Sequence, residues 1–504
     1  MGAIRKAVGF CAVLGLVALF PLPVLAADGV PAGWPGWHLQ AAFLGLLAPL
    51  ALILLAAGAT PPEDVGGTVA AALSALVMGW VSYVACGFAF QFGGLALRVH
   101  WPGLAGLIAE WSPVDPTLGW GAVGLRGFFL AGEAATADTY ALAAVQLPVV
   151  AMAVLIPTLA LCRRMPRGLL VALAALVGGF LYPLAGNWVW GGGWLALLGR
   201  NAGLGHGFVD LGGSATVHLL GASVALAGIL TLGREVSPSR RRVVELPAAH
   251  FPIFMLMGAF LAPAGWLGMI LANPLLTPDM AVGLVMLDIV LAGLGGMAPS
   301  LFYAWLATGR IDALLAARGL VAGLVAGGAG CGFVPPWAAL LIGLLAGTVL
   351  PLLLYWVEHS LHWHDPNAAL AMHAIPGLMG TLWPALFAEG RWGLGWNGGR
   401  AVSPEQGVAG LWVASGYGPD FPGQLYAQLV GLGSILGLAL VLSVLVFGLV
   451  RGGQAVASRV AALHAPAPKR RIRTRRKPKE APAATRYQPA GSRVRDARFS
   501  RSRR

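Results

Sequence analysis

Residues 210–221 read DLGGSATVHLLG, and they place His218 inside an otherwise apolar segment. An imidazole ring in hydrocarbon costs free energy unless a hydrogen-bonding partner or water satisfies it. The position of His218, eight residues after Asp210, therefore needs an explanation.

The composition is that of a polytopic α-helical membrane protein. Of the 504 residues, 58% are hydrophobic and 11% are charged, and the mean hydropathy is +0.76. Soluble proteins carry about 25% charged residues. Several apolar runs reach the roughly 20 residues that a helix needs to cross a bilayer. A β-barrel is excluded, because its strands alternate apolar and polar residues and these runs do not.

The two ends of the chain differ from its middle. Residues 1–27 combine two basic residues, an apolar stretch and small residues near Ala26, which predicts a cleaved secretory signal peptide; an uncleaved first helix is the alternative. Residues 451–504 are rich in Pro, Ala and Arg and hold much of the net charge of +13. They predict a disordered cytoplasmic tail that contacts anionic membrane lipids rather than nucleic acid.

Eleven apolar segments define a membrane domain over 38–450. If cleavage leaves the new N-terminus outside, eleven crossings put the C-terminus in the cytoplasm. The basic residues at 163–167 and 234–242, Arg310 and the tail all fall on that side, so the positive-inside rule agrees. We therefore expect a multi-pass protein of the plasma (inner) membrane. The segments lie at about 38–59, 68–92, 138–162, 168–190, 211–233, 248–272, 280–307, 311–333, 337–357, 366–388 and 422–450.

We call the stretch from Asp210 to His218 the first histidine element. Its spacing of eight residues from aspartate to histidine recurs in DPNAALAMHAIPG (365–377), between Asp365 and His373. Because five segments separate the two elements, we predict two inverted five-helix repeats followed by an eleventh helix. Each aspartate is expected at or near a helix start as an N-cap, with Pro366 in a first helical turn. A rise of 1.5 Å per residue then places each histidine about 12 Å along its helix, so that His218 and His373 meet near the bilayer midplane.

A pair of midplane histidines favours a narrow translocation path in which neighbouring imidazoles pass a hydrogen bond or a proton. Axial ligation of haem is the competing interpretation. Haem does not explain the repeated aspartate or the 72 glycines, which close approach between helices explains better. We therefore expect no cofactor, no metal and no enzymatic activity.

Five stretches resemble, in order, signature segments of the ammonium transporter family, in its Amt branch. The resemblance extends from about residue 38 to 450. It implies a homotrimer with one hydrophobic pore per subunit that moves ammonium or ammonia across the membrane. The stretches are YPLAGNWVWGGGWLA (182–196), DLGGSATVHLLGASVALAG (210–228), GWLGMILAN (265–273), GLVAGLVAGGAGCGF (319–333) and DPNAALAMHAIPGLMGTL (365–382).

The resemblance also implies roles for single residues. His218 and His373 match the twin pore histidines of the family, and Asp210 matches an acidic residue tied to cation recruitment or site integrity. Trp190 matches the tryptophan of the outer mouth, and Trp266 begins a motif whose later positions face the pore. These roles are physically reasonable, because transfer into hydrocarbon costs ammonium much free energy and ammonia little. Deprotonation at the mouth therefore lowers the barrier to crossing.

The chain also departs from the family pattern. Val149 and Met269 stand where the family has two gate phenylalanines, and Asn273 stands for a serine that contacts the cation. Losing two rings removes on the order of a few kcal/mol of cation–π attraction without closing the path. Arg318 is expected to lie near the cytoplasmic end and to extend to the headgroups; a role in blocking the pore is the alternative. The tail lacks the usual C-terminal segment of the family, so control by a PII-type regulator does not carry over.

Three functions remain open at this point. Transport of ammonium or ammonia is favoured, because no recognisable signalling domain follows the eleventh segment. The alternatives are a membrane sensor that binds ammonium with little flux, and a channel for another small molecule such as methylamine or carbon dioxide.

Overall fold

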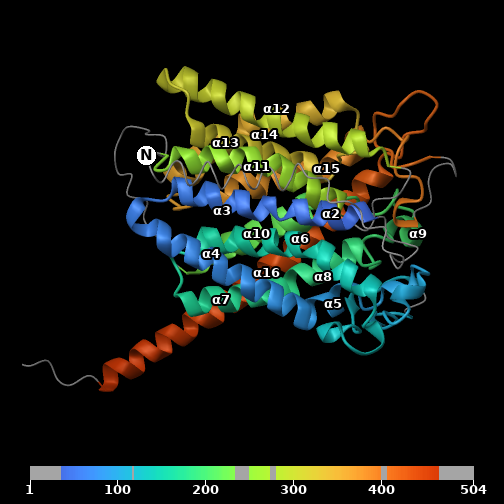
Figure 1. Cartoon of the computed structure of the whole chain (residues 1–504), viewed down its shortest axis with the longest axis horizontal. Coiled ribbons are helices and arrows are strands. Elements are labelled where there is room, and N and C mark those ends of the chain that lie inside the picture. The colour runs from blue at the N-terminus through green and yellow to red at the C-terminus, as the bar shows by residue number, and fades with distance from the viewer. Residues whose placement is uncertain (1–35, 116–117, 233–248, 273–279, 399–405, 465–504) are drawn as a thin grey trace, which may run out of the picture. The chain divides into compact units, whose positions relative to one another are not determined.

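The computed structural model describes residues 36–115, 118–232, 249–272, 280–398 and 406–464 (Figure 1). The predicted signal peptide at 1–27, Asn273 and the tail beyond residue 464 lie outside the described residues. The chain divides into two units, residues 1–453 and 454–504. The membrane domain predicted from the sequence falls within the first.

Helices make up most of the described part of the chain, as predicted. Within the described residues, ten helical spans are long and apolar enough to cross a membrane, and the apolar helix α13 is shorter, at 16 residues. Each predicted segment overlaps one of these helices. The α-helices are α2 (Gly36–Gly45), α3 (Leu47–Ala59), α4 (Pro62–Ser82), α5 (Phe88–Phe92), α6 (Ala137–Leu161), α7 (Arg167–Leu176), α8 (Tyr182–Trp190), α9 (Leu198–Ala202), α10 (Leu220–Thr231), α11 (Pro252–Leu271), α12 (Val282–Thr308), α13 (Ala313–Gly328), α14 (Pro336–Tyr355), α15 (Ile375–Phe387) and α16 (Gly423–His464).

Several spans contain π-helical turns, which the sequence analysis did not predict. A π-turn accommodates one extra residue in a helix and is frequent at functional sites. Two of these turns, η8 and η10, begin the spans that continue as α10 and α15. The π-turns are η1 (Tyr83–Gly87), η7 (Val177–Leu181), η8 (Ser214–Leu219), η9 (Trp356–Ser360) and η10 (Leu370–Ala374).

The contacts around η8 and η10 are reciprocal. The turn η8 contacts α15, which continues η10, and η10 contacts α10, which continues η8. The third helix of each half packs against the fifth in the same way, α6 on α10 and α13 on α15. Such pairing is what two repeats of inverted topology produce.

Glycines allow α12, α13 and α14 to pack closely. A Cβ added at Gly296 of α12 would meet the carbonyl oxygen of Gly319 in α13, and one added at Gly347 of α14 would meet the carbonyl oxygen of Gly296. The hydroxyl of Ser300 donates to the Gly347 carbonyl at 3.0 Å. Small residues at helix contacts are the usual means of bringing membrane helices together.

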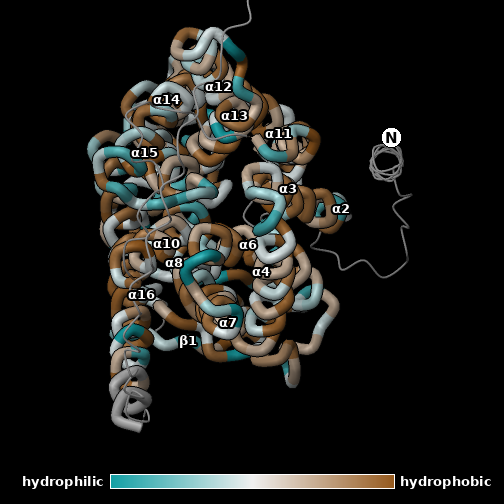
Figure 2. The backbone as a smooth tube through the Cα atoms, turned by 90° about the vertical axis from the view of Figure 1, so that its left-hand side faces the viewer, coloured by the Kyte–Doolittle hydropathy of each residue, from teal (hydrophilic) through white to brown (hydrophobic). Residues whose placement is uncertain are grey.

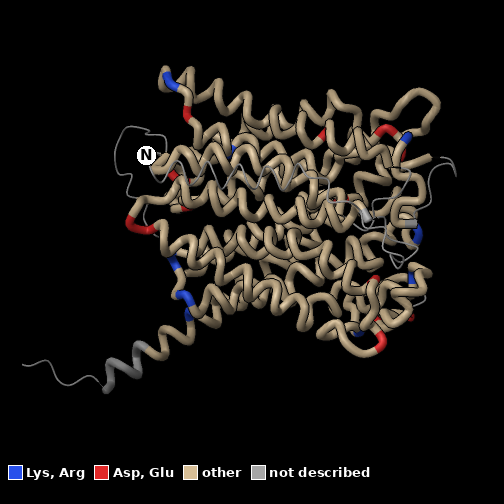
Figure 3. The backbone as a smooth tube through the Cα atoms, in the orientation of Figure 1, with Lys and Arg blue, Asp and Glu red and all other residues tan. Residues whose placement is uncertain are grey.

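The outward surface of the bundle suits lipid. Leu73, Val77, Phe260 and Leu449 are each more than half exposed, and apolar residues predominate in the helices, which Figure 2 shows end-on. Charged residues gather mostly at the two ends of the helices (Figure 3). A large exposed apolar surface of this kind is unfavourable in water and favourable in a bilayer.

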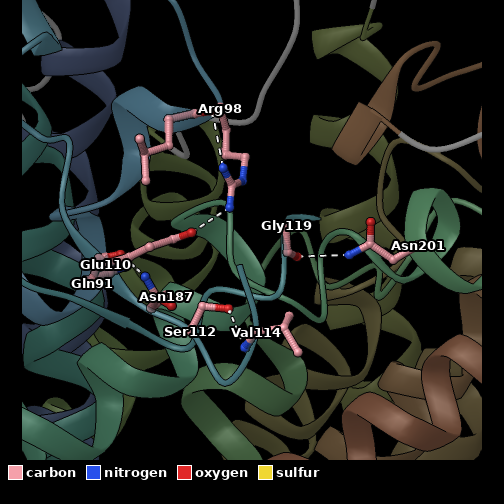
Figure 4. Close-up of polar contacts among 9 residues, drawn as sticks. Gln91, Arg98, Glu110, Ser112, Val114, Gly119, Asn187 and Asn201 are labelled. Carbon is pink, nitrogen blue, oxygen red and sulfur yellow. Dashed lines mark hydrogen bonds and ion pairs between the residues drawn. The ribbon is translucent and has the colours of Figure 1, made fainter. Parts of the chain in front are cut away.

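The chain between α5 and α6 forms an ordered loop at one end of the bundle. Its short strands β1 (Glu110–Trp111) and β2 (Val123–Gly124) pair antiparallel. The Arg98 guanidinium pairs with the Glu110 carboxylate, and the Asn201 amide donates to the Gly119 carbonyl at 2.9 Å (Figure 4). Its 3-10 turns are η2 (Leu95–Leu97), η3 (Pro102–Leu104), η5 (Phe128–Leu130) and η6 (Gly132–Ala134); another, η11 (Trp396–Gly398), follows α15.

Two glutamines of α16 form hydrogen bonds with the segment that precedes Asp210. The backbone N–H groups of His206 and Val209 donate to the side-chain oxygens of Gln424 and Gln428, at 2.9 and 2.8 Å. The Gln428 amide also donates to the carbonyls of Val209 and Thr381. The last helix therefore fixes the approach to the first histidine element.

The glycine packing makes a testable prediction. Gly296→Ala should lower the unfolding temperature in detergent by several degrees, because overpacking costs about 1–3 kcal/mol. Gly283→Ala, on the same helix, is the control, since a Cβ there has nothing within 4 Å. Equal thermal shifts for the two variants would show that the contact with Gly319 is not tight.

The buried ring of His206 makes a second prediction, for pH dependence. Burial lowers the pKa of His206 to about 4, whereas an unfolded histidine titrates near about 6.5. The unfolded chain binds the proton more readily, so this stability is present above the unfolded pKa and is lost as the pH falls towards 4. Unfolding temperatures measured from pH 7 to 4 should fall less steeply in His206→Gln than in the wild type. An unchanged slope would contradict the assignment.

Candidate functional site

The structure brings the two predicted histidines together. The ring centroids of His218 and His373 are 5.2 Å apart, and their planes differ by 9°. The indole of Trp266 on α11 also lies parallel to His218, with centroids 5.4 Å apart and an angle of 6°. All three side chains are buried.

The two imidazoles are stacked and are not hydrogen-bonded to each other. Among the described residues, neither ring nitrogen of His218 has a hydrogen-bond partner, nor has Nδ1 of His373. A hydrogen bond passed between neighbouring imidazoles, as the sequence suggested, therefore does not run directly from ring to ring in this geometry. Unpaired imidazole nitrogens are the polar groups that a small hydrogen-bonding solute would meet here.

The local backbone around the histidines repeats as well as the sequence does. His218 lies on η8 and His373 on η10, so each ring projects from a π-turn. Three residues after each aspartate comes a residue with positive φ, Gly213 at 75° and Ala368 at 55°. An alanine rarely adopts this conformation, which costs of order 1–3 kcal/mol and is found where the surrounding structure imposes it.

The carboxylates of the two aspartates hold the helix starts. One oxygen of Asp210 accepts from the backbone N–H groups of Ala215 and Thr216, at 3.1 and 2.8 Å, and from the Thr216 hydroxyl at 2.7 Å. One oxygen of Asp365 accepts from the Leu370 N–H at 2.8 Å. Both aspartates thus lie a few residues before a helix start, whereas the N-cap positions themselves are occupied by Gly213 and Ala369.

The second helix begins later than the sequence indicated. Pro366 was expected in a first helical turn but lies in a turn before the helix. The helix starts beyond Ala368, because the chain first makes the positive-φ turn that brings the Asp365 carboxylate to the Leu370 N–H.

One cavity, which we call the Trp190 cavity, lies beside the start of the first histidine element. Val149 and Met269, the positions predicted to replace the aromatic gate, both line it together with Trp190. The Trp190 indole donates to the Asp210 carbonyl at 3.1 Å, which places Asp210 directly behind this wall. The lining residues are Val145, Gln146, Val149, Trp190, Leu211, Gly212 and Met269.

A second cavity, which we call the Arg318 cavity, reaches His373. Arg318 is only 4% exposed, and its guanidinium donates to the Pro366 carbonyl at 2.7 Å. The expectation that Arg318 extends to the headgroups is therefore wrong; the free carbonyl of the turn before η10 holds it inside. The lining residues are Leu52, Leu55, Ala56, Ala59, Ile156, Leu159, Leu314, Arg318, Asn367, Ala369, Met372 and His373.

The helices order these parts along one line. Met269, which lines the Trp190 cavity, is one helical turn from Trp266, and Trp266 stacks on His218. His218 stacks in turn on His373, which lines the Arg318 cavity. On α6, Val149 lines the first cavity and Ile156 the second, seven residues or about 10 Å further along. The histidine pair therefore lies between the two cavities.

Sequence reasoning missed several residues that build this arrangement. Thr216 supplies a hydroxyl to Asp210, and Ser214 joins η8 to α13 through the Val325 carbonyl and the Ala329 N–H. Gln146 brings an amide to the Trp190 cavity. The hydroxyls in GGSAT, directly after Asp210, were the available signal for the first two.

The model of the Ammonium Transporter Family matches residues 36–452 of the chain. The chain belongs to this family. The sequence resemblance is thus confirmed, over almost the same residues as predicted.

Named relatives of the chain and solved structures with a similar fold agree with this assignment. The ammonium transporter Amt2 of Archaeoglobus fulgidus is 29% identical over 364 residues, which cover 71% of this chain and 72% of that protein. Amt1 of Methanocaldococcus jannaschii is 33% identical over 210 residues, or 42% and 51%. A sensor Amt protein has a similar fold, with a TM-score of 0.64, 23% identity and coverage of 82% and 92%. For Candida albicans Mep2 the TM-score is 0.63, with 19% identity and coverage of 81% and 82%.

The bond from Thr216 to Asp210 yields a third prediction. Thr216→Val removes one donor from a buried carboxylate and should destabilise the protein by about 1–3 kcal/mol. Thr216→Ser keeps the hydroxyl and is the matched control. Thermal unfolding in detergent compares the two, and an equal loss in both would show that the methyl group, not the hydrogen bond, matters.

Proposed function

We propose that this chain transports ammonium along a path from the Trp190 cavity, past the histidine pair, to the Arg318 cavity. The observation that carries the proposal is the stacked pair of buried histidines. Each histidine comes from one repeat of an ammonium transporter fold, and in each repeat an aspartate carboxylate binds the start of the helix. The names of the relatives supply the substrate, and the geometry supports the route.

Recruitment is assigned to the Trp190 cavity. An indole face attracts a cation, and the Trp190 indole that lines this cavity donates to the backbone carbonyl of Asp210. Val149 and Met269 provide apolar surface where rings would strengthen this attraction, so we expect weak binding at this step. The cation gives up a proton to water at this mouth, because ammonia enters an apolar passage at far lower cost than ammonium.

Passage is assigned to His218 and His373. Ammonia carries three N–H donors and one lone pair, and an imidazole can accept or donate at its nitrogens. The unpaired ring nitrogens compensate part of the lost hydration of ammonia between the two cavities. The stacked geometry presents the two rings one after the other along the path.

The remaining assignments follow from the sequence. The Trp190 cavity faces outside and the Arg318 cavity faces the cytoplasm, in a plasma-membrane protein with a cytoplasmic C-terminus. The chain assembles as a homotrimer, and its basic tail binds anionic lipids. Asn273 belongs to the outer half of the path by its place in the sequence. No role is assigned to a PII-type regulator.

Flux through proteoliposomes tests the function. The wild type should take up ammonium after a concentration jump and should exclude potassium. His218→Ala and His373→Ala should each lower the flux at least tenfold or lose that discrimination, because a polar group on the path is removed. His250→Ala is the control, since His250 is exposed and away from both cavities.

Two results would count against the proposal. Wild-type flux and discrimination retained in both histidine variants would remove the pair from the mechanism. Ammonium binding by the wild type without any flux would instead indicate a sensor.

A further inference from the structure

Arg318 brings a permanent charge to the wall of the cavity next to His373. The two side chains line the same cavity, and most of the other lining residues are apolar. Arginine is effectively never deprotonated in proteins. Whatever passes His373 on this side must therefore pass a guanidinium.

The charge of Arg318 is not neutralised by direct contact. In the described part of the chain, no ion pair is formed between this guanidinium and a carboxylate. Asp365, Glu358 and Asp312 attract it from a longer distance. The Asp365 carboxylate accepts from the Leu370 N–H instead.

The position of the charge is fixed. The bond from the guanidinium to the Pro366 carbonyl ties α13 to the turn that begins the segment of His373. Asn367, in the same turn, is held by its amide N–H, which donates to the Leu159 carbonyl at 2.7 Å. The side-chain oxygen of Asn367 accepts no hydrogen bond from the described residues.

We propose that Arg318 makes this cavity a barrier to cations, so that nitrogen crosses it as neutral ammonia. The inference rests on the proposed transport function and adds a determinant of selectivity to it. A fixed positive charge in a narrow, poorly hydrated passage repels a second cation strongly and acts weakly on a neutral solute. The arginine then adds a selection against charge to the discrimination made by the histidine pair.

Charge and hydrogen bonding can be separated by substitution. Arg318→Lys keeps the charge, Arg318→Gln keeps an N–H donor for the Pro366 carbonyl without charge, and Arg318→Met keeps an unbranched stem of comparable length. Proteoliposomes loaded with a thallium-sensitive dye measure entry of Tl⁺, a monovalent cation close to potassium in size. Ammonium uptake is measured on the same preparations.

The wild type and Arg318→Lys should both exclude Tl⁺. Arg318→Gln and Arg318→Met should admit Tl⁺ at least tenfold faster than the wild type, and the ratio of Tl⁺ entry to ammonium uptake should rise by the same factor. Neutral variants as tight as the wild type would overturn the proposal. So would a lysine variant that leaks as much as the glutamine variant.

Asn367→Asp gives an independent test in case the Arg318 variants do not fold. It adds a carboxylate to the same wall and should raise Tl⁺ entry with Arg318 still in place; no increase would contradict the barrier. A wild type without ammonium flux would count against the transport function itself. Ammonium flux combined with Tl⁺-tight neutral variants would count against the arginine barrier alone.

Discussion

The structure depends on two buried carboxylates, each of which binds backbone N–H groups at the start of a helix. Asp210 and Asp365 each accept backbone N–H groups five or six residues further along the chain. A residue with positive φ lies between the aspartate and the helix in both cases. Each carboxylate takes the place of the carbonyl partners that the N–H groups at a helix start lack. The chain can therefore begin a helix inside the bundle without a preceding helical turn.

That constraint explains the placement of the histidines. The helices begin as π-turns, and the wider turn lets each ring project towards its counterpart from the other repeat. Reciprocal packing of each π-turn on the helix that follows the other one then makes the two rings neighbours. The walls around them come from α6 and α11, which carry apolar residues and Trp266.

Much of this arrangement could be predicted from the sequence, for reasons that differ from residue to residue. The pairing of His218 with His373 followed from a repeated spacing, since inverted repeats map one element onto the other. The meeting of Val149, Met269 and Trp190 around one cavity agreed with the family resemblance. The π-turns could not be predicted, because no residue pattern distinguishes them from an α-helix of the same composition.

Arg318 shows a different limit of the sequence. Its apolar neighbours and its place early in a helix were equally consistent with a side chain that extends to the headgroups. The deciding partner, the Pro366 carbonyl, is 48 residues away in the sequence and is a backbone group. A contact of this kind leaves no signal in residue types.

The amide of Gln428 has a consequence for how the molecule moves. Through Val209 and Thr381 this one side chain joins both repeats, just before Asp210 in the first and beyond His373 in the second. Transporters built from inverted repeats commonly work by rocking one repeat against the other. Such a motion here would have to break several hydrogen bonds of a buried amide at once. Helix α16, which belongs to neither repeat, thus acts as a brace that opposes such a rocking motion.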